Sequence, residues 1–263
     1  MLQRRKFLQY MSLAGAGAAF SLGFPSLKAA IANDKDGLGE WNYDRFGPES
    51  WGQLSPDFRV CENGTQQSPI NLEHEGTLHA NNLHDLDFNY HLSVLKIVNN
   101  GHTIQVNPDP DNHLKVAGKN FDLLQFHFHH PSEHVVYGKH YPMEAHLVHR
   151  CKEDGELTVL GVFFEEGEEN QILNTIWKDL PEHKSKEHAI IGHINPMQFL
   201  PAQKLAYRYN GSLTTPPCSQ IVRWIVFEEA IKASKQQLDK FAQIFPNNAR
   251  PVQPSNHRLI IEG

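Results

Sequence analysis

The feature that most constrains this chain is an alternation of aromatic and imidazole side chains at residues 125–129, which read Gln-Phe-His-Phe-His. In a β-strand, successive side chains point to opposite faces, so His127 and His129 share one face and the two phenylalanines share the other. Residues 144–149, Glu-Ala-His-Leu-Val-His, form a second strand-like segment, and a stretch rich in turn residues separates the two. An antiparallel return of the chain would therefore place His146 beside the first pair of histidines.

Three imidazoles that converge from rigid strands form a set of metal ligands. Catalytic zinc sites typically have three protein ligands and one open position, whereas structural zinc sites have four protein ligands. No cysteine stands close enough in sequence to predict a fourth ligand. Gln125 and Glu144 each stand two positions before a histidine, His127 and His146 respectively, and ligand histidines usually direct their second ring nitrogen to such an acceptor. The pattern predicts a three-histidine zinc site with an open coordination position.

The rest of the chain indicates a mainly β domain with a few peripheral helices. Segments that are rich in β-branched or aromatic residues, or that alternate in polarity, predict strands at 94–98, 103–106, 124–129, 144–150, 158–164 and 221–227. The sequence Asn-Asn-Gly-His at 99–102 predicts a hairpin turn between the first two strands. Helices are predicted over 170–180 and 228–245. Residues 33–263 contain no internal repeat or flexible linker, so they are predicted to form one domain.

Residues 1–32 have the order of a secretory signal peptide. Arg4, Arg5 and Lys6 precede an apolar stretch, and the small-x-small pattern at 30–32 suits a signal peptidase. The paired arginines favour a twin-arginine signal, with a general secretory signal as the alternative. The apolar stretch is shorter than the roughly 20 residues of a membrane span, so an uncleaved anchor is a minor alternative. We therefore expect a periplasmic or secreted protein.

Cysteine content and charge set two further limits. Cys61, Cys151 and Cys218 are the three cysteines of the chain, and in an oxidising compartment one pair can form a bridge. Their spacing alone does not choose the pair. The formal net charge is −6 and no basic stripe is present, which argues against a nucleic-acid partner.

Beyond these patterns, the chain resembles the α-class carbonic anhydrases over nearly all of its length after residue 32. The matching motifs follow one another in the family's order: Trp41 to Trp51, Gln67-Ser68-Pro69-Ile70, Asn99-Asn100-Gly101-His102, Gln125 to His129, Ser132-Glu133-His134, Glu144 to His149, Gly211 to Pro217, and Trp224. The resemblance implies a large, twisted, mostly antiparallel sheet with zinc at the base of a conical cleft. It also implies a metalloenzyme that reversibly hydrates carbon dioxide to bicarbonate and a proton, through zinc-bound hydroxide.

The resemblance assigns roles to side chains outside the histidine trio. Thr214 would receive a hydrogen bond from the hydroxide and donate one to Glu133, while Thr215 would contact bicarbonate. His102 would shuttle protons to solvent, and Tyr43 would belong to the solvent network. An apolar pocket for carbon dioxide is implied at Val148, Val159, Leu213, Val222 and Trp224.

Several structural details follow from the same resemblance. It implies a disulfide between Cys61 and Cys218, which leaves Cys151 reduced, and cis peptide bonds before Pro69 and Pro217. Sulfonamides and small anions would be inhibitors, and a homodimer is one expectation for the assembly. His130 departs from the pattern, because animal enzymes carry tryptophan at that position.

Three other functions compete with this interpretation. A periplasmic zinc-binding or zinc-buffering protein would need the three histidines, but it would have no use for Thr214, Glu133 and a proton shuttle together. A non-catalytic binding protein of the same fold would lack one or more of the metal histidines, and this chain has all three. Hydrolysis of activated esters is a side reaction that the same zinc hydroxide could perform.

Overall fold

The computed structural model describes residues 40–73, 76–80 and 86–263, so the predicted signal peptide lies outside the described residues. Helical segments are short, and they are α2 (Trp51–Leu54), η1 (Pro56–Phe58), α3 (Val60–Asn63), α4 (Gln171–Trp177), η2 (Pro196–Phe199) and α5 (Lys235–Ile244). The first eight strands are β1 (Asn71–Leu72), β2 (Leu78–His79), β3 (Leu86–Asn89), β4 (Ser93–Asn99), β5 (Ile104–Pro108), β6 (His113–Val116), β7 (Lys119–His129) and β8 (Val135–Val136). The remaining strands are β9 (Lys139–His140), β10 (Met143–Cys151), β11 (Leu157–Glu166), β12 (His188–Ile194), β13 (Ala206–Gly211), β14 (Val222–Phe227), β15 (Ile231–Ala233) and β16 (Ile261–Glu262).

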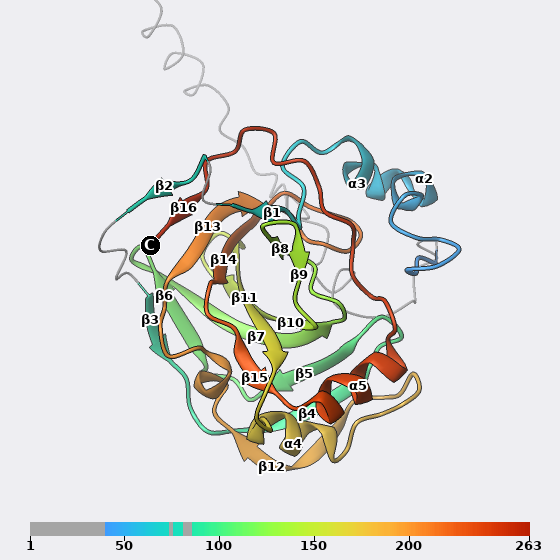
Figure 1. The fold of residues 1–263 in the computed structure, drawn as a ribbon, viewed down its shortest axis with the longest axis vertical. Helices are drawn as coiled ribbons and strands as arrows, with labels where there is room; N and C mark the ends of the chain where they lie inside the picture. Colours follow the sequence, from blue (N-terminus) through green and yellow to red (C-terminus); the bar gives the residue numbers. More distant parts are fainter. Residues whose placement is uncertain (1–39, 74–75, 81–85) are drawn as a thin grey trace, which may run out of the picture. The chain divides into compact units, whose positions relative to one another are not determined.

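One large sheet organises the described chain, as the family resemblance implied. Its main path runs β12-β4-β5-β7-β10-β11-β14-β13-β16-β2, while β3, β6 and β15 pair at its sides (Figure 1). Most neighbours are antiparallel, and parallel pairing joins β11 to β14 and β15 and joins β16 to β2. A small second sheet contains β1, β8 and β9. All six predicted strands are confirmed, with ends that differ by a few residues.

The register of the central strands gives the sheet two different faces. His146 lies opposite His127, and Ala145 lies opposite Phe128. Because facing residues in a sheet project to the same side, His127, His129 and His146 share one face, and Phe128 and Ala145 share the other. We call these the site face and the core face.

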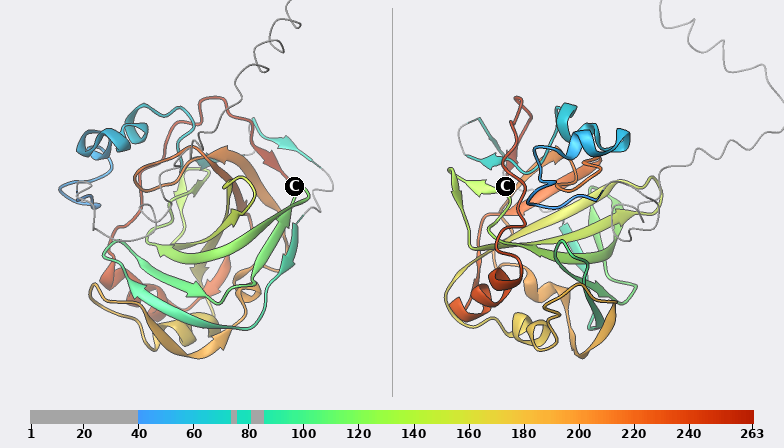
Figure 2. Two further views of the ribbon diagram at one scale, coloured as in Figure 1. Left: turned by 180° about the vertical axis from the view of Figure 1, so that it is seen from behind. Right: turned by 90° about the vertical axis from the view of Figure 1, so that its right-hand side faces the viewer.

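The core face is covered by the helices that follow the central strands. Phe128 packs with its ring centroid 5.0 Å from that of Trp177 in α4 and 6.0 Å from that of Phe241 in α5. Figures 1 and 2 show α4 and α5 side by side, far from α2 and α3. Burial of these apolar side chains supplies the main stabilisation of the fold, at roughly 25 cal/mol per Å² of apolar surface.

One helix prediction is confirmed and the other is partly wrong. The segment predicted at 170–180 forms α4, and the Asn170 side chain caps its first turn. The segment predicted at 228–245 divides in two, because Ile231–Ala233 form β15, which pairs with β11 in parallel. Helix α5 begins only after Ser234, which forms a capping box with Gln237. Strand pairing therefore overrides the helical pattern of residues 228–234.

The predicted covalent and backbone details are present. Cys61 and Cys218 form a disulfide, and Cys151 is buried and reduced. The peptide bonds before Pro69 and Pro217 are cis, and a third cis bond, before Pro131, was not predicted. Among the described residues, no helix is long and apolar enough to cross a bilayer.

Candidate metal centre

Three histidines meet on the site face of the sheet. His127 and His129 come from β7 and His146 comes from β10, and one ring nitrogen of each lies within 4.8 Å of the others. His129 and His146 are each 1% exposed, whereas His127 is half-buried, so the cluster opens on the side of His127. Within the described part of the chain, no fourth histidine, cysteine or carboxylate has a ligand atom within that distance of all three rings.

Each of the three rings uses its other nitrogen in a hydrogen bond. His127 Nδ1 pairs with Gln125 Oε1 at 2.8 Å, and His146 Nε2 pairs with Glu144 Oε1 at 2.8 Å. His129 Nδ1 pairs with the backbone carbonyl of Asn248 at 2.8 Å. These bonds fix the ring orientations and direct His127 Nε2, His129 Nε2 and His146 Nδ1 towards the centre of the cluster.

Glu144 anchors the deepest part of the cluster. Its carboxylate accepts four hydrogen bonds, from His146 Nε2, His134 Nδ1 and the backbone N–H groups of Glu133 and His134. Four acceptor sites are the full capacity of a carboxylate. His134, Glu144 and His146 also have ligand atoms close together, but these atoms already pair with one another. This second group therefore supports His146 and offers no separate metal site.

Burial acts to lower the pKa of all three rings, and the neighbouring charges add to this effect at His127 and oppose it at His146. Burial, and then repulsion from the other two histidines, holds the pKa of His127 well below its usual range, and burial lowers the pKa of His129. Burial also acts to lower the pKa of His146, but the Glu144 carboxylate outweighs it and raises that pKa. For Glu144, burial acts to raise the pKa, but His134 and His146 outweigh it, so the carboxyl stays ionised. A cation bound at His146 Nδ1 would displace a proton from the ring.

Glu133 lies beside the cluster with one oxygen engaged. Its Oε1 accepts a hydrogen bond of 2.8 Å from the backbone N–H of Arg250. Its Oε2 lies 3.5 Å from His129 Nε2 and 3.8 Å from His146 Nδ1, and it is buried without a hydrogen-bond partner. Thr214 is 5% exposed, and the described residues show no hydrogen bond between its hydroxyl and Glu133. Oε2 is thus the atom that remains to accept a hydroxyl proton.

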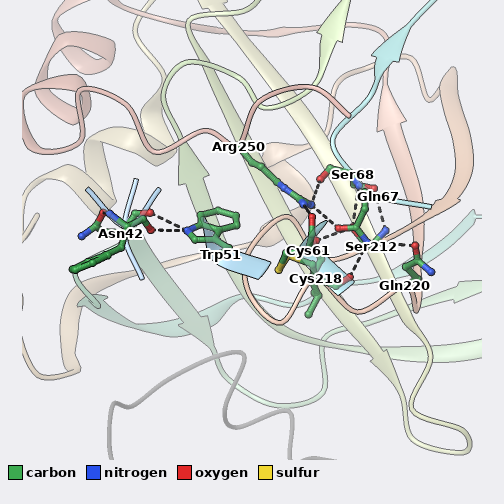
Figure 3. Close-up of a disulfide and its surroundings, with 11 residues drawn as sticks. Asn42, Trp51, Cys61, Gln67, Ser68, Ser212, Cys218, Gln220 and Arg250 are labelled. Carbon is green, nitrogen blue, oxygen red and sulfur yellow. Dashed lines mark hydrogen bonds between the residues drawn. A yellow bond between two sulfur atoms is a disulfide. The ribbon is translucent and has the colours of Figure 1, made fainter. Parts of the chain in front are cut away.

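The loop that carries Thr214 and Thr215 is tied down around the disulfide. Figure 3 shows the Arg250 guanidinium pointing to Gln67, to the Ser68 carbonyl and to the Cys61 carbonyl, with donor–acceptor distances of 2.8–2.9 Å. Gln67 Nε2 in turn donates to the Cys218 carbonyl at 3.1 Å. Arg250 therefore links the disulfide to Glu133, because its backbone N–H binds that carboxylate.

An apolar wall continues the site face beyond His146. Val148 lies opposite Val159, and Val159 lies opposite Trp224, so all three project to the side of the histidines. Val222 lies opposite Leu157, two residues before the Val159–Trp224 pair, so it projects to the same side. Val148, Val159, Val222 and Trp224 are all buried. Trp224 also packs its ring centroid 4.8 Å from that of His146. The fifth predicted pocket residue, Leu213, is half-buried in the loop before β14.

His102 and Tyr43 both pack against Trp41. The His102 ring is half-buried and stacks on Trp41, with 3.8 Å between ring centroids and 9° between planes. Tyr43 packs edge-on against Trp41 and Trp51. Burial, and then the negative charge of Glu133, raises the pKa of the Tyr43 hydroxyl, which therefore keeps its proton.

Comparison with known proteins decides the family. The family model of the eukaryotic-type carbonic anhydrases matches residues 46–262. A carbonic anhydrase from Nostoc sp. is 46% identical over 266 residues, which cover 99% of this chain and 98% of that relative. The chain belongs to the carbonic anhydrase family.

Solved structures agree with this assignment. The α-carbonic anhydrase of Thermovibrio ammonificans, in complex with the inhibitor sulfanilamide, superposes with a TM-score of 0.82 at 46% identity, over 85% of this chain and 99% of that one. A carbonic anhydrase from Chlamydomonas reinhardtii, in complex with acetazolamide, gives 0.75 at 37% identity, over 85% and 99%. The chain is therefore an enzyme of the carbonic anhydrase type, and its family supports carbon dioxide hydration.

Two residues of this carbonic anhydrase site were not predicted from the sequence. Asn248 contributes a backbone carbonyl to His129, and Arg250 contributes a backbone N–H to Glu133. Backbone groups carry no signature in the amino-acid sequence, and these two lie more than a hundred residues from their partners.

Proposed function

We propose that this carbonic anhydrase hydrates carbon dioxide reversibly with a zinc ion held by His127, His129 and His146. The observation that carries the proposal is the arrangement of the two nitrogens in each ring. One nitrogen binds a protein acceptor, and the other lies near the corresponding nitrogens of the other two rings. Histidines that only packed together would not need an acceptor for each ring, and they would not leave His129 Nε2 buried without a hydrogen-bond partner.

The donor set fits zinc. His129 Nε2 is fully buried and has no hydrogen-bond partner, a costly state that a bound cation would relieve. Imidazole nitrogens are ligands of borderline softness that suit zinc, and three neutral ligands leave its charge uncancelled. When bound, zinc supplies the electrophilic charge that makes water acidic near neutral pH, and carbonic anhydrases are the standard example of this effect.

Glu133 and Thr214 would orient the nucleophile. Glu133 Oε2 is the free acceptor beside the histidines, and its charge is stabilised by the Arg250 N–H at Oε1. A Thr214 hydroxyl that donates to Oε2 can only accept a hydrogen bond at the centre, which selects one orientation of the reacting oxygen. Thr215, beside it, would contact bicarbonate.

The apolar wall would hold carbon dioxide. Carbon dioxide is small and apolar, so its binding depends on contact with Val148, Val159, Leu213, Val222 and Trp224 more than on hydrogen bonds. The wall begins at Val148, two residues beyond His146 on the same face of β10, so substrate and reacting oxygen would lie side by side.

Turnover also requires a proton to leave the centre. His102 would carry it, because an imidazole titrates near neutral pH and this ring is half-buried. Its backbone carbonyl binds Asn248, whose own carbonyl binds His129, so the residue is close to the metal strand. Tyr43, which keeps its proton, would help to order the water between them.

Inhibitors and location belong to the same proposal. The relatives' complexes with sulfanilamide and acetazolamide support sulfonamides as ligands of this centre, and anions would compete for the same position. The Cys61–Cys218 disulfide supports an oxidising compartment, in agreement with export to the periplasm or medium. The homodimer stays a prediction.

Metal removal tests the proposal directly. We expect chelation to abolish carbon dioxide hydration in stopped-flow assays, and stoichiometric zinc to restore it. A zinc-buffering protein would bind the metal equally well but would hydrate carbon dioxide no faster than free zinc. An acetazolamide titration that removes ester hydrolysis and hydration together would assign both to one centre. Hydration that persists in the metal-free protein would overturn the proposal.

A further inference from the structure

We infer that the Asn248 side chain is a positioning residue that holds the proton-relay turn, residues 99–103, against the metal strand β7. The inference rests on the proposed function, because the relay role of His102 is part of that proposal. It concerns the side chain of Asn248 and is separate from the backbone carbonyl that binds His129.

The Asn248 amide makes three hydrogen bonds to two different parts of the site. Its Nδ2 donates to the His102 carbonyl at 3.0 Å and to the Phe128 carbonyl at 2.9 Å. Its Oδ1 accepts from the backbone N–H of His130 at 2.8 Å. Asn248 is 1% exposed, so these bonds have no competition from solvent. One side chain thus joins the backbone of the relay residue to the peptides on either side of His129.

A second tie meets the first at Phe128. Thr103 Oγ1 donates to the Phe128 carbonyl at 2.5 Å and accepts from the Phe128 N–H at 3.2 Å. The Phe128 carbonyl therefore receives both Thr103 and Asn248. This peptide lies between the metal ligands His127 and His129, so both ties end at the ligand-bearing segment.

The other hydrogen bonds of the turn do not replace these ties. Asn99 Oδ1 and Asn100 Oδ1 accept from N–H groups of residues 101–103, which sets the shape of the turn. Asn99 also bonds to Pro181 and Ser185, on a different segment. Ladder pairing between β5 and β7 begins only at Gln105, opposite His127. Among the hydrogen bonds described for the turn, those of Asn248 and Thr103 are therefore the ones that join it directly to the metal strand.

Loss of the Asn248 amide should separate two steps of the reaction. Proton transfer depends steeply on the distance between donor and acceptor, and a displacement of about 1 Å can cost about 100-fold in rate. Hydration of carbon dioxide takes place at the trio and the apolar wall. Asn248→Ala retains the backbone carbonyl that binds His129, and His127 and His146 keep their acceptors Gln125 and Glu144. We expect the variant to lose proton transfer while hydration itself continues.

The kinetic experiment compares Asn248→Ala with wild type and with Asn112→Ala, all as zinc-loaded protein. Asn112 is a matched control, because it is 1% exposed and its side chain also makes three hydrogen bonds, to His91, Ser93 and Asp109. In dilute buffer, we expect kcat of Asn248→Ala to fall about threefold to tenfold with kcat/KM within about twofold of wild type, and added imidazole to restore kcat. Asn112→Ala should leave both constants unchanged. Equal losses in kcat and kcat/KM, no rescue by imidazole, or no loss at all would overturn the inference.

Two further arms separate this inference from the proposed function. Hydrogen exchange of metal-free protein should be at least about fivefold faster for amides 101–103 in Asn248→Ala than in Asn112→Ala, with amides of β10 unchanged. Unchanged exchange in the turn would disprove the tether whatever the kinetics. If His102→Ala keeps full kcat in dilute buffer, the relay proposal is wrong while the exchange result still decides the tether. If Asn248→Ala does not fold, Asn248→Ser, which keeps one small polar group, is held to the same criteria.

Discussion

The two faces of strands β7 and β10 are built from neighbouring residues by different physical rules. On the core face, Phe128 is held by contact with apolar side chains from α4 and α5, and Ala145 lies opposite it in the same buried cluster. On the site face, His127 and His146 are held by one hydrogen bond each to a chosen acceptor. Packing contacts are many and weak, so the core face is stable without being chemically specific. Hydrogen bonds in a buried site are few and directional, so each one decides where a ring points.

The difference also explains where polar groups are tolerated. Glu144 is completely buried on the site face, and its four hydrogen bonds fill its capacity as an acceptor. His149 is the corresponding exception on the core face, where Tyr90 and the Thr158 carbonyl satisfy its two nitrogens. Glu144 and His149 are therefore tolerated in the interior because each has a complete set of hydrogen-bond partners.

The largest effect is expected on the site face, from His146→Ala. We expect near-complete loss of carbon dioxide hydration and at least about tenfold weaker zinc binding, because losing a ligand exceeds the roughly 10–100-fold cost of losing a ligand's hydrogen-bond partner. Competition with a chelator measures the affinity, and stopped-flow assays measure the activity. Wild-type zinc affinity in this variant would show that the ligand set is wrong.

On the core face, Phe128→Ala should lower the stability of the protein and leave its zinc binding nearly unchanged. We expect the free energy of unfolding to fall by about 3–5 kcal/mol, because the cavity lies against Trp177 and Phe241. Zinc affinity of the folded protein should stay within about threefold, since the ligands and their acceptors remain. Urea titration of the metal-free protein gives the stability. A zinc-binding loss as large as that of His146→Ala would mean that the faces are not independent.

The buried His149 makes the stability of the core face depend on pH. Burial lowers the pKa of His149 to about 4, from about 6.5 in the unfolded chain. Between these two pKa values the unfolded state is protonated at His149 and the folded state is not. The free energy of unfolding is therefore highest above pH 6.5 and decreases as the pH falls to about 4. We expect wild type to lose about 3 kcal/mol relative to His149→Gln over this window.

Urea titrations of both metal-free proteins at pH 7, 5.5 and 4 measure this difference without a contribution from zinc release. Tyr90→Phe is a useful companion, because it removes the hydrogen bond to His149 but leaves the imidazole in place. Parallel stability curves for wild type and His149→Gln would show that this histidine does not titrate as described.

The smallest effect on stability and zinc binding is expected at Gly161 of β11, where the absence of a side chain leaves room for Glu144 of β10. Gly161 lies opposite His146, and a methyl group there would meet Glu144 Oε1 at 3.0 Å and the Val226 methyls at 3.2 Å. We expect Gly161→Ala to cost about 1–3 kcal/mol of stability and to weaken zinc binding by up to about tenfold, by shifting the partner of His146.

Val162→Ala, one residue further along β11 and on the core face, is the control for this substitution. It should lower the free energy of unfolding by a comparable amount with no change in zinc affinity. If both variants bind zinc alike, the close approach of Gly161 to Glu144 has no part in the metal site.

Much of the site was predictable from local sequence because strand geometry is local. The alternation at 125–129 determines that His127 and His129 share a face, and the Asn-Asn-Gly-His turn determines where β4 reverses into β5. The partners at two positions before a histidine are also determined by the strand repeat, and both bonds are present in the structure.

The tertiary structure decided what depends on distant parts of the chain. The helical pattern over 228–234 gave way to strand β15 because β11 offered a parallel partner, and a local pattern carries no information about such pairing. Asn248 and Arg250 entered the site through backbone groups brought next to β7 and Glu133 by the return of the chain from α5. Every residue has the same backbone donor and acceptor, so only folding could determine which of them the histidine and the carboxylate would meet.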